Sequence, residues 1–202
     1  MEKSPTTVTV TSLQSVDVHE CTRNPCQHGR CVNKDVGYTC TCSPGWTGQN
    51  CQQVKPCPSG WRDRNNYCYK LMTDRVNWKT ADANCKKQRA NLASIHSQAE
   101  MNFVSALITN APQSGEQPIV WFGMNRWWDG GWKWSDGSRV TYTNWAPGEP
   151  NKKAYMSIVP PSCSGISTKN GKEWLWGAHR QKGHWTDQRC HAVFASICKA
   201  PK

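Results

Sequence analysis

The sequence predicts an α+β domain preceded by a small module that is held together by disulfide bonds. The 12 cysteines form two groups of six. The first group occupies Cys21–Cys51, about 31 residues, which is too short to bury a stabilising core. After Cys57, two stretches with apolar residues at helical spacing precede many short Trp-rich stretches separated by Gly, Asp, Asn and Pro. Helices followed by short strands are typical of an α+β domain.

An even number of cysteines in 202 residues indicates a disulfide framework rather than metal sites. We therefore expect an oxidising compartment and a secreted or extracellular protein. Residues 1–16 are rich in Thr, Ser and Val and are expected to form a flexible N-terminal segment. The segment Met1–Pro5 opens no apolar run of signal-peptide length, so we expect a processed form, a fragment such as part of a cell-surface protein, or a sequence from an incomplete gene model. No stretch is apolar enough for a membrane span in this chain.

Most of the net charge of +11 lies in the part of the chain that begins at Cys57. Residues 57–202 hold 20 Lys and Arg against 10 Asp and Glu. Such a surface would attract anionic partners such as sulfated or sialylated glycans. A well-solvated basic surface with no partner is an equal alternative. Nucleic acid is not expected as a partner, since no basic run is longer than two residues.

The two helices of the larger domain have recognisable starts. Asn77 precedes an apolar-periodic stretch and is expected to cap it. Ser97 and Glu100 have the spacing of a capping box at the start of a second helix. Before them, aromatic residues alternate loosely between Trp61 and Leu71, which predicts a half-buried strand.

The first cysteine group has the spacing C-x4-C-x4-C-x8-C-x-C-x8-C, with Gly37, Tyr38, Pro44, Gly45, Trp46 and Gly48 in its second half. This resembles an EGF-like module, which we place at residues 17–52, with a short linker over 52–56. Six cysteines allow 15 pairings. The resemblance implies Cys21–Cys31, Cys26–Cys40 and Cys42–Cys51, and each bridge stabilises such a domain by roughly 2–5 kcal/mol.

The EGF-like module partly resembles the calcium-binding subtype. Asp17, Glu20 and Asn33 would then hold Ca2+, although His19 occupies a slot that is normally Asp, Asn, Glu or Gln. A purely structural module is the alternative.

Residues 57–200 resemble a C-type lectin-like domain. The resemblance rests on three motifs: W-F-G-M at 121–124, W-K-W-S-D-G-S at 132–138, and Y-T-N-W-A-P-G-E-P-N at 142–151. It implies two helices, short antiparallel strands and a long loop. It also implies the disulfides Cys57–Cys68, Cys85–Cys198 and Cys163–Cys190. The order of the two modules resembles that of the lecticans.

The resemblance implies a sugar site built on Ca2+. Glu149 and Asn151 flank Pro150, and the E-P-N triplet resembles the version that selects mannose, N-acetylglucosamine and fucose. Across the site, Thr186 and Asp187 stand where the family has its Asn and Asp. Calcium accepts 6–8 oxygen ligands, so Glu149, Asn151 and Asp187 would hold the ion. The peptide bond before Pro150 is expected to be cis, as in the family.

Two departures weaken the expected calcium site. Thr186 replaces an amide ligand with a shorter hydroxyl. Lys152 and Lys153 follow the triplet, where the family has an acidic residue. We therefore expect a dissociation constant near ~10⁻³ M. The segment 164–184 is long, and its basic residues and its tryptophans, Trp174 and Trp176, could contact an anionic sugar or pack in the core.

The sequence therefore predicts a calcium-assisted carbohydrate-binding lectin, with Thr186 as a fourth sugar-contacting residue. The partners would be glycans on cell surfaces, microbes or matrix. The alternative is a calcium-independent, protein-binding adhesion or matrix module with a vestigial sugar site. No nucleophile and base stand in a recognisable set, so catalysis is not expected.

Overall fold

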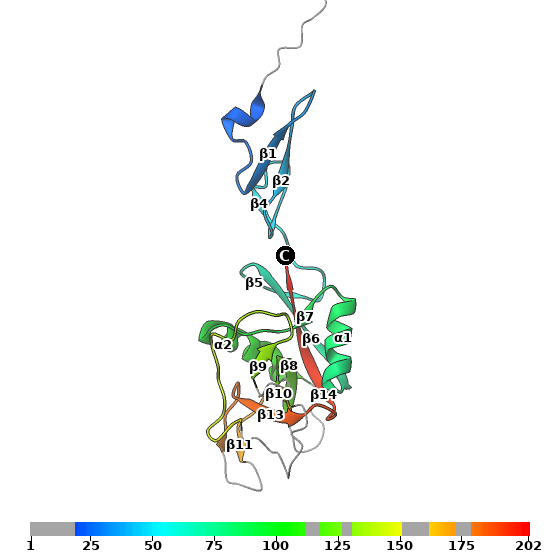
Figure 1. Cartoon of the computed structure of the whole chain (residues 1–202), viewed down its shortest axis with the longest axis vertical. Coiled ribbons are helices and arrows are strands. Elements are labelled where there is room, and N and C mark those ends of the chain that lie inside the picture. Colours follow the sequence, from blue (N-terminus) through cyan, green and yellow to red (C-terminus); the bar gives the residue numbers. More distant parts are fainter. Residues whose placement is uncertain (1–18, 112–117, 127–130, 151–161, 173–178) are drawn as a thin grey trace, which may run out of the picture. The chain divides into compact units, whose positions relative to one another are not determined.

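The computed structural model describes residues 19–111, 118–126, 131–150, 162–172 and 179–202. Contacts divide the chain into two compact units, Met1–Lys55 and Pro56–Lys202. Each unit has its own elements and its own disulfides (Figure 1). We describe them separately.

The first unit is built from two hairpins and three disulfides. Its elements are η1 (Glu20–Arg23), β1 (Gly29–Asn33), β2 (Tyr38–Cys42), β3 (Trp46–Thr47) and β4 (Gln53–Val54). β1 pairs with β2 and β3 with β4, both antiparallel. The disulfides are Cys21–Cys31, Cys26–Cys40 and Cys42–Cys51, the pairs that the EGF resemblance implied. β4 lies inside the stretch expected to be a linker.

The second unit consists of two helices and a large mixed sheet, so the predicted α+β class is confirmed. Strand order in the sheet is β13-β10-β8-β14-β6-β5, with β7 paired to β14 and β9 to β8. Only β8 and β14 pair in parallel among these described strands. The elements are β5 (Arg62–Arg64), β6 (Tyr67–Val76), α1 (Trp78–Lys87), β7 (Asn91–Leu92), α2 (Gln98–Leu107), η2 (Ile108–Asn110), β8 (Ile119–Arg126), β9 (Trp132–Trp134), β10 (Ser162–Ser167), β11 (Gly171–Lys172), β12 (His179–Arg180), β13 (Trp185–Arg189) and β14 (Phe194–Pro201).

Both helices begin where the sequence predicts. The Asn77 side chain accepts a hydrogen bond from Thr80 N, 2.9 Å away. The Ser97 hydroxyl accepts from Glu100 N at 3.2 Å. Glu100 departs from the usual capping box, because its carboxylate accepts from the backbone N–H of His96 rather than that of Ser97. This shift leaves its other oxygen facing the core.

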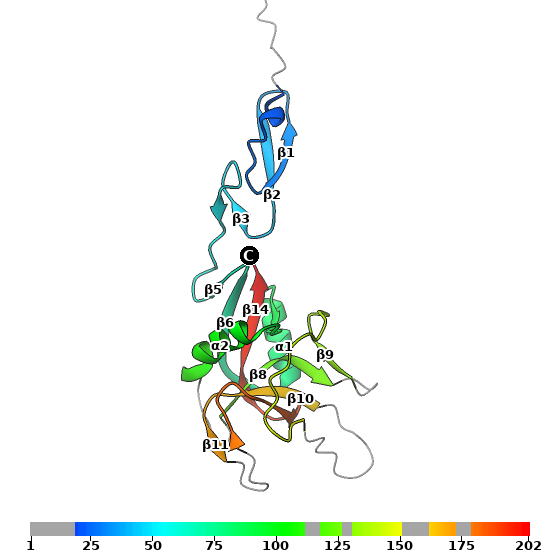
Figure 2. The same cartoon turned by 90° about the vertical axis from the view of Figure 1, so that its left-hand side faces the viewer.

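The two helices cover opposite faces of the sheet (Figures 1 and 2). One buried cluster contains Met101 and Val104 of α2, packed with Phe122 and Trp185. The other contains residues of α1, packed around Trp121. Three disulfides connect the elements of this unit. Cys85–Cys198 joins α1 to β14, and Cys163–Cys190 joins β10 to the residue after β13. Cys57–Cys68 joins the segment before β5 to β6. These pairs are the ones that the lectin resemblance implied.

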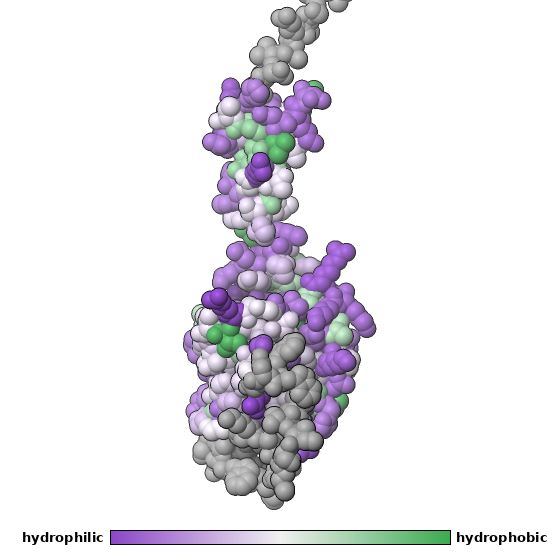
Figure 3. All heavy atoms as spheres, in the orientation of Figure 1, coloured by the Kyte–Doolittle hydropathy of each residue, from purple (hydrophilic) through white to green (hydrophobic). Residues whose placement is uncertain are grey.

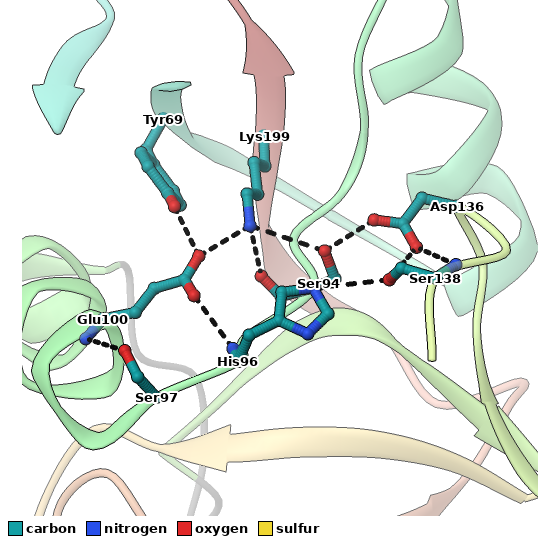
Figure 4. A network of polar contacts seen from close by, with 8 residues as sticks. All are labelled: Tyr69, Ser94, His96, Ser97, Glu100, Asp136, Ser138 and Lys199. Atoms are coloured by element: carbon teal, nitrogen blue, oxygen red, sulfur yellow. Dashed lines mark hydrogen bonds and ion pairs between the residues drawn. The ribbon is translucent and has the colours of Figure 1, made fainter. Parts of the chain in front are cut away.

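A buried ion pair connects α2 with the last strand (Figure 4). Lys199 Nζ lies 2.6 Å from Glu100 Oε1 and donates to the Ser94 carbonyl at 3.0 Å. Tyr69 also donates to Glu100 Oε1. Burial raises the pKa of the Glu100 carboxyl, but the hydrogen bonds from Lys199, Tyr69 and His96 outweigh it, so the pKa lies below its ordinary value.

The same network continues into the turn that leads to the candidate site. Ser94 Oγ donates to Asp136 Oδ2, and Asp136 Oδ1 accepts from the Ser138 hydroxyl at 2.6 Å and the Ser138 N–H at 2.9 Å. Burial raises the pKa of Asp136, but these hydrogen bonds lower it by a larger amount, so the pKa lies below its ordinary value. The W-S-D-G-S turn is therefore bonded to the segment that follows β7.

The face of the molecule shown in Figure 3 is mostly hydrophilic wherever residues are described. Large apolar side chains are exposed at scattered positions: Val32, Val36, Val54, Tyr67, Val140 and Val193. Among the described residues, no helix has the length and apolar character needed to cross a membrane.

Candidate functional site

The segment before the E-P-N triplet runs along the edge of β13 that faces away from β10. Trp145 forms a parallel bridge with Trp185. Trp185 N donates to the Asn144 carbonyl at 2.8 Å, and Ala146 N donates to the Trp185 carbonyl at 2.9 Å. Because β13 is the edge strand of the sheet, these bonds fix where the following turn begins.

The turn after Ala146 brings Glu149 to the next position along that edge. Glu149 N donates to the Ala146 carbonyl, and Gly148 has a φ of +79°, which favours glycine. The peptide bond between Glu149 and Pro150 is cis, as the resemblance implied. Glu149 Oε2 accepts from Asp187 N at 3.4 Å. A loop carboxylate and a strand residue therefore meet, although they lie 38 positions apart in the chain.

Strand geometry places further oxygen atoms at this edge. In an antiparallel strand, the N–H and C=O of one residue point to the same side. The Asp187 N–H points to Glu149, so the Asp187 carbonyl faces the same edge. The Asp187 side chain is 4% exposed. Carboxylate and carbonyl oxygens are the type of ligand that Ca2+ prefers, so the Glu149 carboxylate and the Asp187 carbonyl are the described groups that could contribute to a calcium site.

Several residues expected at the site lie outside the described residues. These are Asn151, Lys152, Lys153, Trp174 and Trp176. Among the residues that are described, no group of three or more His, Cys, Asp and Glu side chains is arranged to hold a metal ion. The contact that the structure shows at this point joins the Glu149 carboxylate to the backbone N–H of Asp187.

Thr186 is buried and its hydroxyl has a partner within its own strand. The residue is 1% exposed, and Oγ1 accepts from Gln188 Nε2 at 3.0 Å. Residues 186 and 188 project from the same face of β13. The sequence prediction did not include Gln188. Residues two positions apart in a strand project from the same face, so the spacing could have placed Gln188 beside Thr186.

An aromatic cluster lies beneath the site and fixes β13. Trp185 is fully buried, and its indole N–H contacts Met101 Sδ at 3.1 Å. Its ring lies 5.6 Å from that of Tyr142 and 5.8 Å from that of Trp145, and Trp145 in turn lies 4.7 Å from Trp132. Aromatic pairs contribute about 0.5–1.5 kcal/mol beyond their buried area, so this cluster stabilises the packing of Trp185, two residues before Asp187 in β13.

In the first unit, the expected ligands of an EGF calcium site are differently engaged. Asp17 lies outside the described residues. Asn33 Oδ1 accepts from Cys21 N at 3.0 Å, and Asn33 Nδ2 lies 3.2 Å from His19 Nδ1. Glu20 Oε2 is buried and has no hydrogen-bond partner among the described residues. The contacts of Asn33 support the purely structural alternative.

Replacing Asn33 with alanine is expected to speed hydrogen exchange at the Cys21 amide by about fivefold, with calcium and with chelator alike. The reason is the loss of the bond from this N–H to Asn33 Oδ1. Amide exchange followed by NMR on the whole chain measures the effect. A loss of protection seen only in calcium would instead support Asn33 as an ion ligand.

Comparison with known proteins identifies both units. Residues 74–200 match the C-type lectin domain family, and residues 21–50 match the EGF-like domain family. The chain belongs to the C-type lectin family. The predicted order of an EGF-like module followed by a C-type lectin domain is thus confirmed, and C-type lectins are non-enzymatic binding proteins.

Several individual proteins are similar to this C-type lectin. The galactose-specific lectin nattectin of Thalassophryne nattereri is 39% identical over 97 residues, which span 48% of this chain and 60% of nattectin. The C-type lectin lectoxin-Lio1 of Erythrolamprus poecilogyrus is 33% identical over 147 residues, 71% of this chain and 80% of the relative. A calcium-independent type II antifreeze protein has a similar solved structure: TM-score 0.58, 28% identity, 74% of this chain and 98% of that one.

Proposed function

We propose that this C-type lectin binds carbohydrate with the help of calcium. Glu149, Asn151 and Asp187 would hold the ion and accept hydrogen bonds from sugar hydroxyls, with Thr186 beside them. The observation that carries the proposal is the contact between the Glu149 carboxylate and Asp187 N at the edge of β13 that faces away from β10. It supports convergence of the loop and the strand on one point.

Each part of the chain would have a distinct task in binding. When bound, calcium supplies a flexible shell of 6–8 oxygens in which sugar hydroxyls can take places. Glu149 provides charge from the loop, and the Asp187 carbonyl faces the same edge of β13. The buried Trp185 ring keeps that strand in place, so little ordering is needed on binding.

The E-P-N triplet favours mannose, N-acetylglucosamine and fucose as the sugar class. The name of nattectin describes a galactose-specific lectin, and that relative matches this chain over only part of its length. Galactose is therefore the informative contrast sugar. Glycans on cell surfaces, microbes or matrix are the proposed partners, and the six disulfides support an extracellular location. We keep residues 17–52 and 57–200 as the proposed module limits.

A glycan array run with millimolar calcium and again with chelator tests the proposal. We expect binding to mannose-type or fucose-type glycans that is lost in chelator, and weaker binding to galactose. The millimolar concentration is needed because the depleted ligand set predicts weak affinity. Chelator-insensitive binding to the same sugars would contradict the calcium mechanism.

A calcium-independent, protein-binding module is the second candidate. The burial of Thr186 and its bond to Gln188 favour it, because the hydroxyl already has a partner in the strand. The calcium-independent type II antifreeze protein has a similar fold. On the array, this candidate predicts no sugar signal. Binding to sulfated glycans that ignores chelator but falls with salt would assign recognition to the basic surface instead.

A further inference from the structure

A buried hydroxyl group lies on the strand next to the proposed calcium site. Ser164 in β10 is fully buried. Its Oγ has no hydrogen-bond partner among the residues that the structure describes. Most buried hydroxyls in folded proteins are paired, so an unpaired one calls for an explanation.

Strand register places this hydroxyl beside a proposed ligand. β10 and β13 are antiparallel, and Ser164 lies directly opposite Asp187. Directly opposite residues project from the same face of a sheet, with Cβ atoms about 4.5–5.5 Å apart. Both residues are buried. A hydroxyl with a proton to donate is therefore held next to a carboxylate of the proposed site.

The backbone around Ser164 is irregular and closely held. On the side facing β8, the register of β10 shifts between Cys163 and Gly165. Such irregularities often redirect a side chain next to a binding site. Gly165 packs so closely that a Cβ there would overlap Ile119 Cγ2. On the other side, Cys163 is bonded to Cys190. The residues on both sides of Ser164 are therefore held in place, Cys163 by its disulfide and Gly165 by close packing.

We propose that Ser164 is a positioning residue for calcium binding. The hydroxyl is unpaired among the described residues here; when calcium is bound, it would turn to donate to one oxygen of the Asp187 carboxylate and hold that group in the orientation that binds the ion. Groups that hydrogen-bond to metal ligands in this way raise metal affinity without touching the metal. The inference rests on the proposed function.

The test compares two alanine variants of the whole chain with the unchanged chain. Ser164→Ala removes the proposed donor. Ser167→Ala is the matched control, because Ser167 is in the same strand, is also fully buried and also lacks a partner among the described residues. Its side chain projects from the opposite face of β10. Calcium affinity is measured by calorimetry, and the melting temperature is measured in chelator.

Ser164→Ala is expected to weaken calcium binding about tenfold. Its melting temperature in chelator should stay equal or rise, because an unpaired buried hydroxyl is removed. Ser167→Ala should leave calcium affinity unchanged. Unchanged calcium affinity in Ser164→Ala, or an equal loss in both variants, would overturn the positioning role while leaving the proposed function intact. Absence of calcium binding by the unchanged chain would overturn both.

Discussion

Replacing Lys199 with methionine is expected to lower the free energy of unfolding by about 3–5 kcal/mol at pH 7, because it leaves a buried carboxylate without its ion-pair partner. Lys199 Nζ lies 2.6 Å from Glu100 Oε1, and the two side chains are 7% and 11% exposed. Urea denaturation followed by tryptophan fluorescence measures the change. The signal reports mainly on the C-type lectin domain, which holds all the tryptophans except Trp46.

The control variant is Lys86→Met. Lys86 pairs with Asp82 at the same distance, 2.6 Å, but its side chain is 56% exposed. Solvent screening should keep the effect of losing this pair below about 0.5 kcal/mol. Equal losses in the two variants would show that burial of the Lys199 pair is not the cause.

Acid should reduce the difference between the unchanged chain and Lys199→Met. The pKa of Glu100 is held below its ordinary value of 4.5. A carboxyl with a lowered pKa contributes stability above its unfolded pKa and loses it as the pH falls through the folded pKa. The unchanged chain should therefore lose the Glu100 contribution as the pH falls below 4.5 and through the lower folded pKa, and it should lose the contribution of Asp136 in the same direction. A difference that stays constant down to pH 3 would contradict this assignment.

Local chemistry was readable from the sequence wherever it depends on neighbouring residues. Asn77 and Ser97 cap their helices because capping needs only a side-chain oxygen and an N–H three residues later. The cysteine spacing and the tryptophan motifs allowed the two families to be recognised. The cis bond at Pro150 followed from the same resemblance.

Contacts between distant residues were not readable in the same way. The pair of Lys199 and Glu100 joins positions 99 residues apart, and nothing in either local sequence specifies it. The position of Ser164 opposite Asp187 depends on the register of two strands that are not adjacent in the chain. A shift of one residue would have turned Ser164 to the other face. Single-sequence reasoning therefore named the carboxylates of the proposed site but not the groups that the fold places around them.

Replacing Glu149 with alanine is expected to weaken calcium binding at least about tenfold and to abolish calcium-dependent sugar binding. The reason is the loss of the carboxylate that lies against the Asp187 backbone at the outer edge of β13 and that is proposed to hold the ion. Calorimetry with calcium alone and the glycan array measure the two effects. Glu149→Gln should have an intermediate effect, because it keeps an oxygen at the same position but removes the charge.

Asp74→Ala is the matched control for charge. Asp74 is an exposed carboxylate in β6, outside the site, so its loss alters the net charge in the same way as the loss of Glu149. We expect Asp74→Ala to leave calcium and sugar binding unchanged. The stability of Glu149→Ala in chelator should also change little, since the bond from Asp187 N is long, at 3.4 Å. Full, chelator-sensitive sugar binding by Glu149→Ala would place the calcium ion elsewhere, because no ion held at this edge could lose that carboxylate without weaker binding.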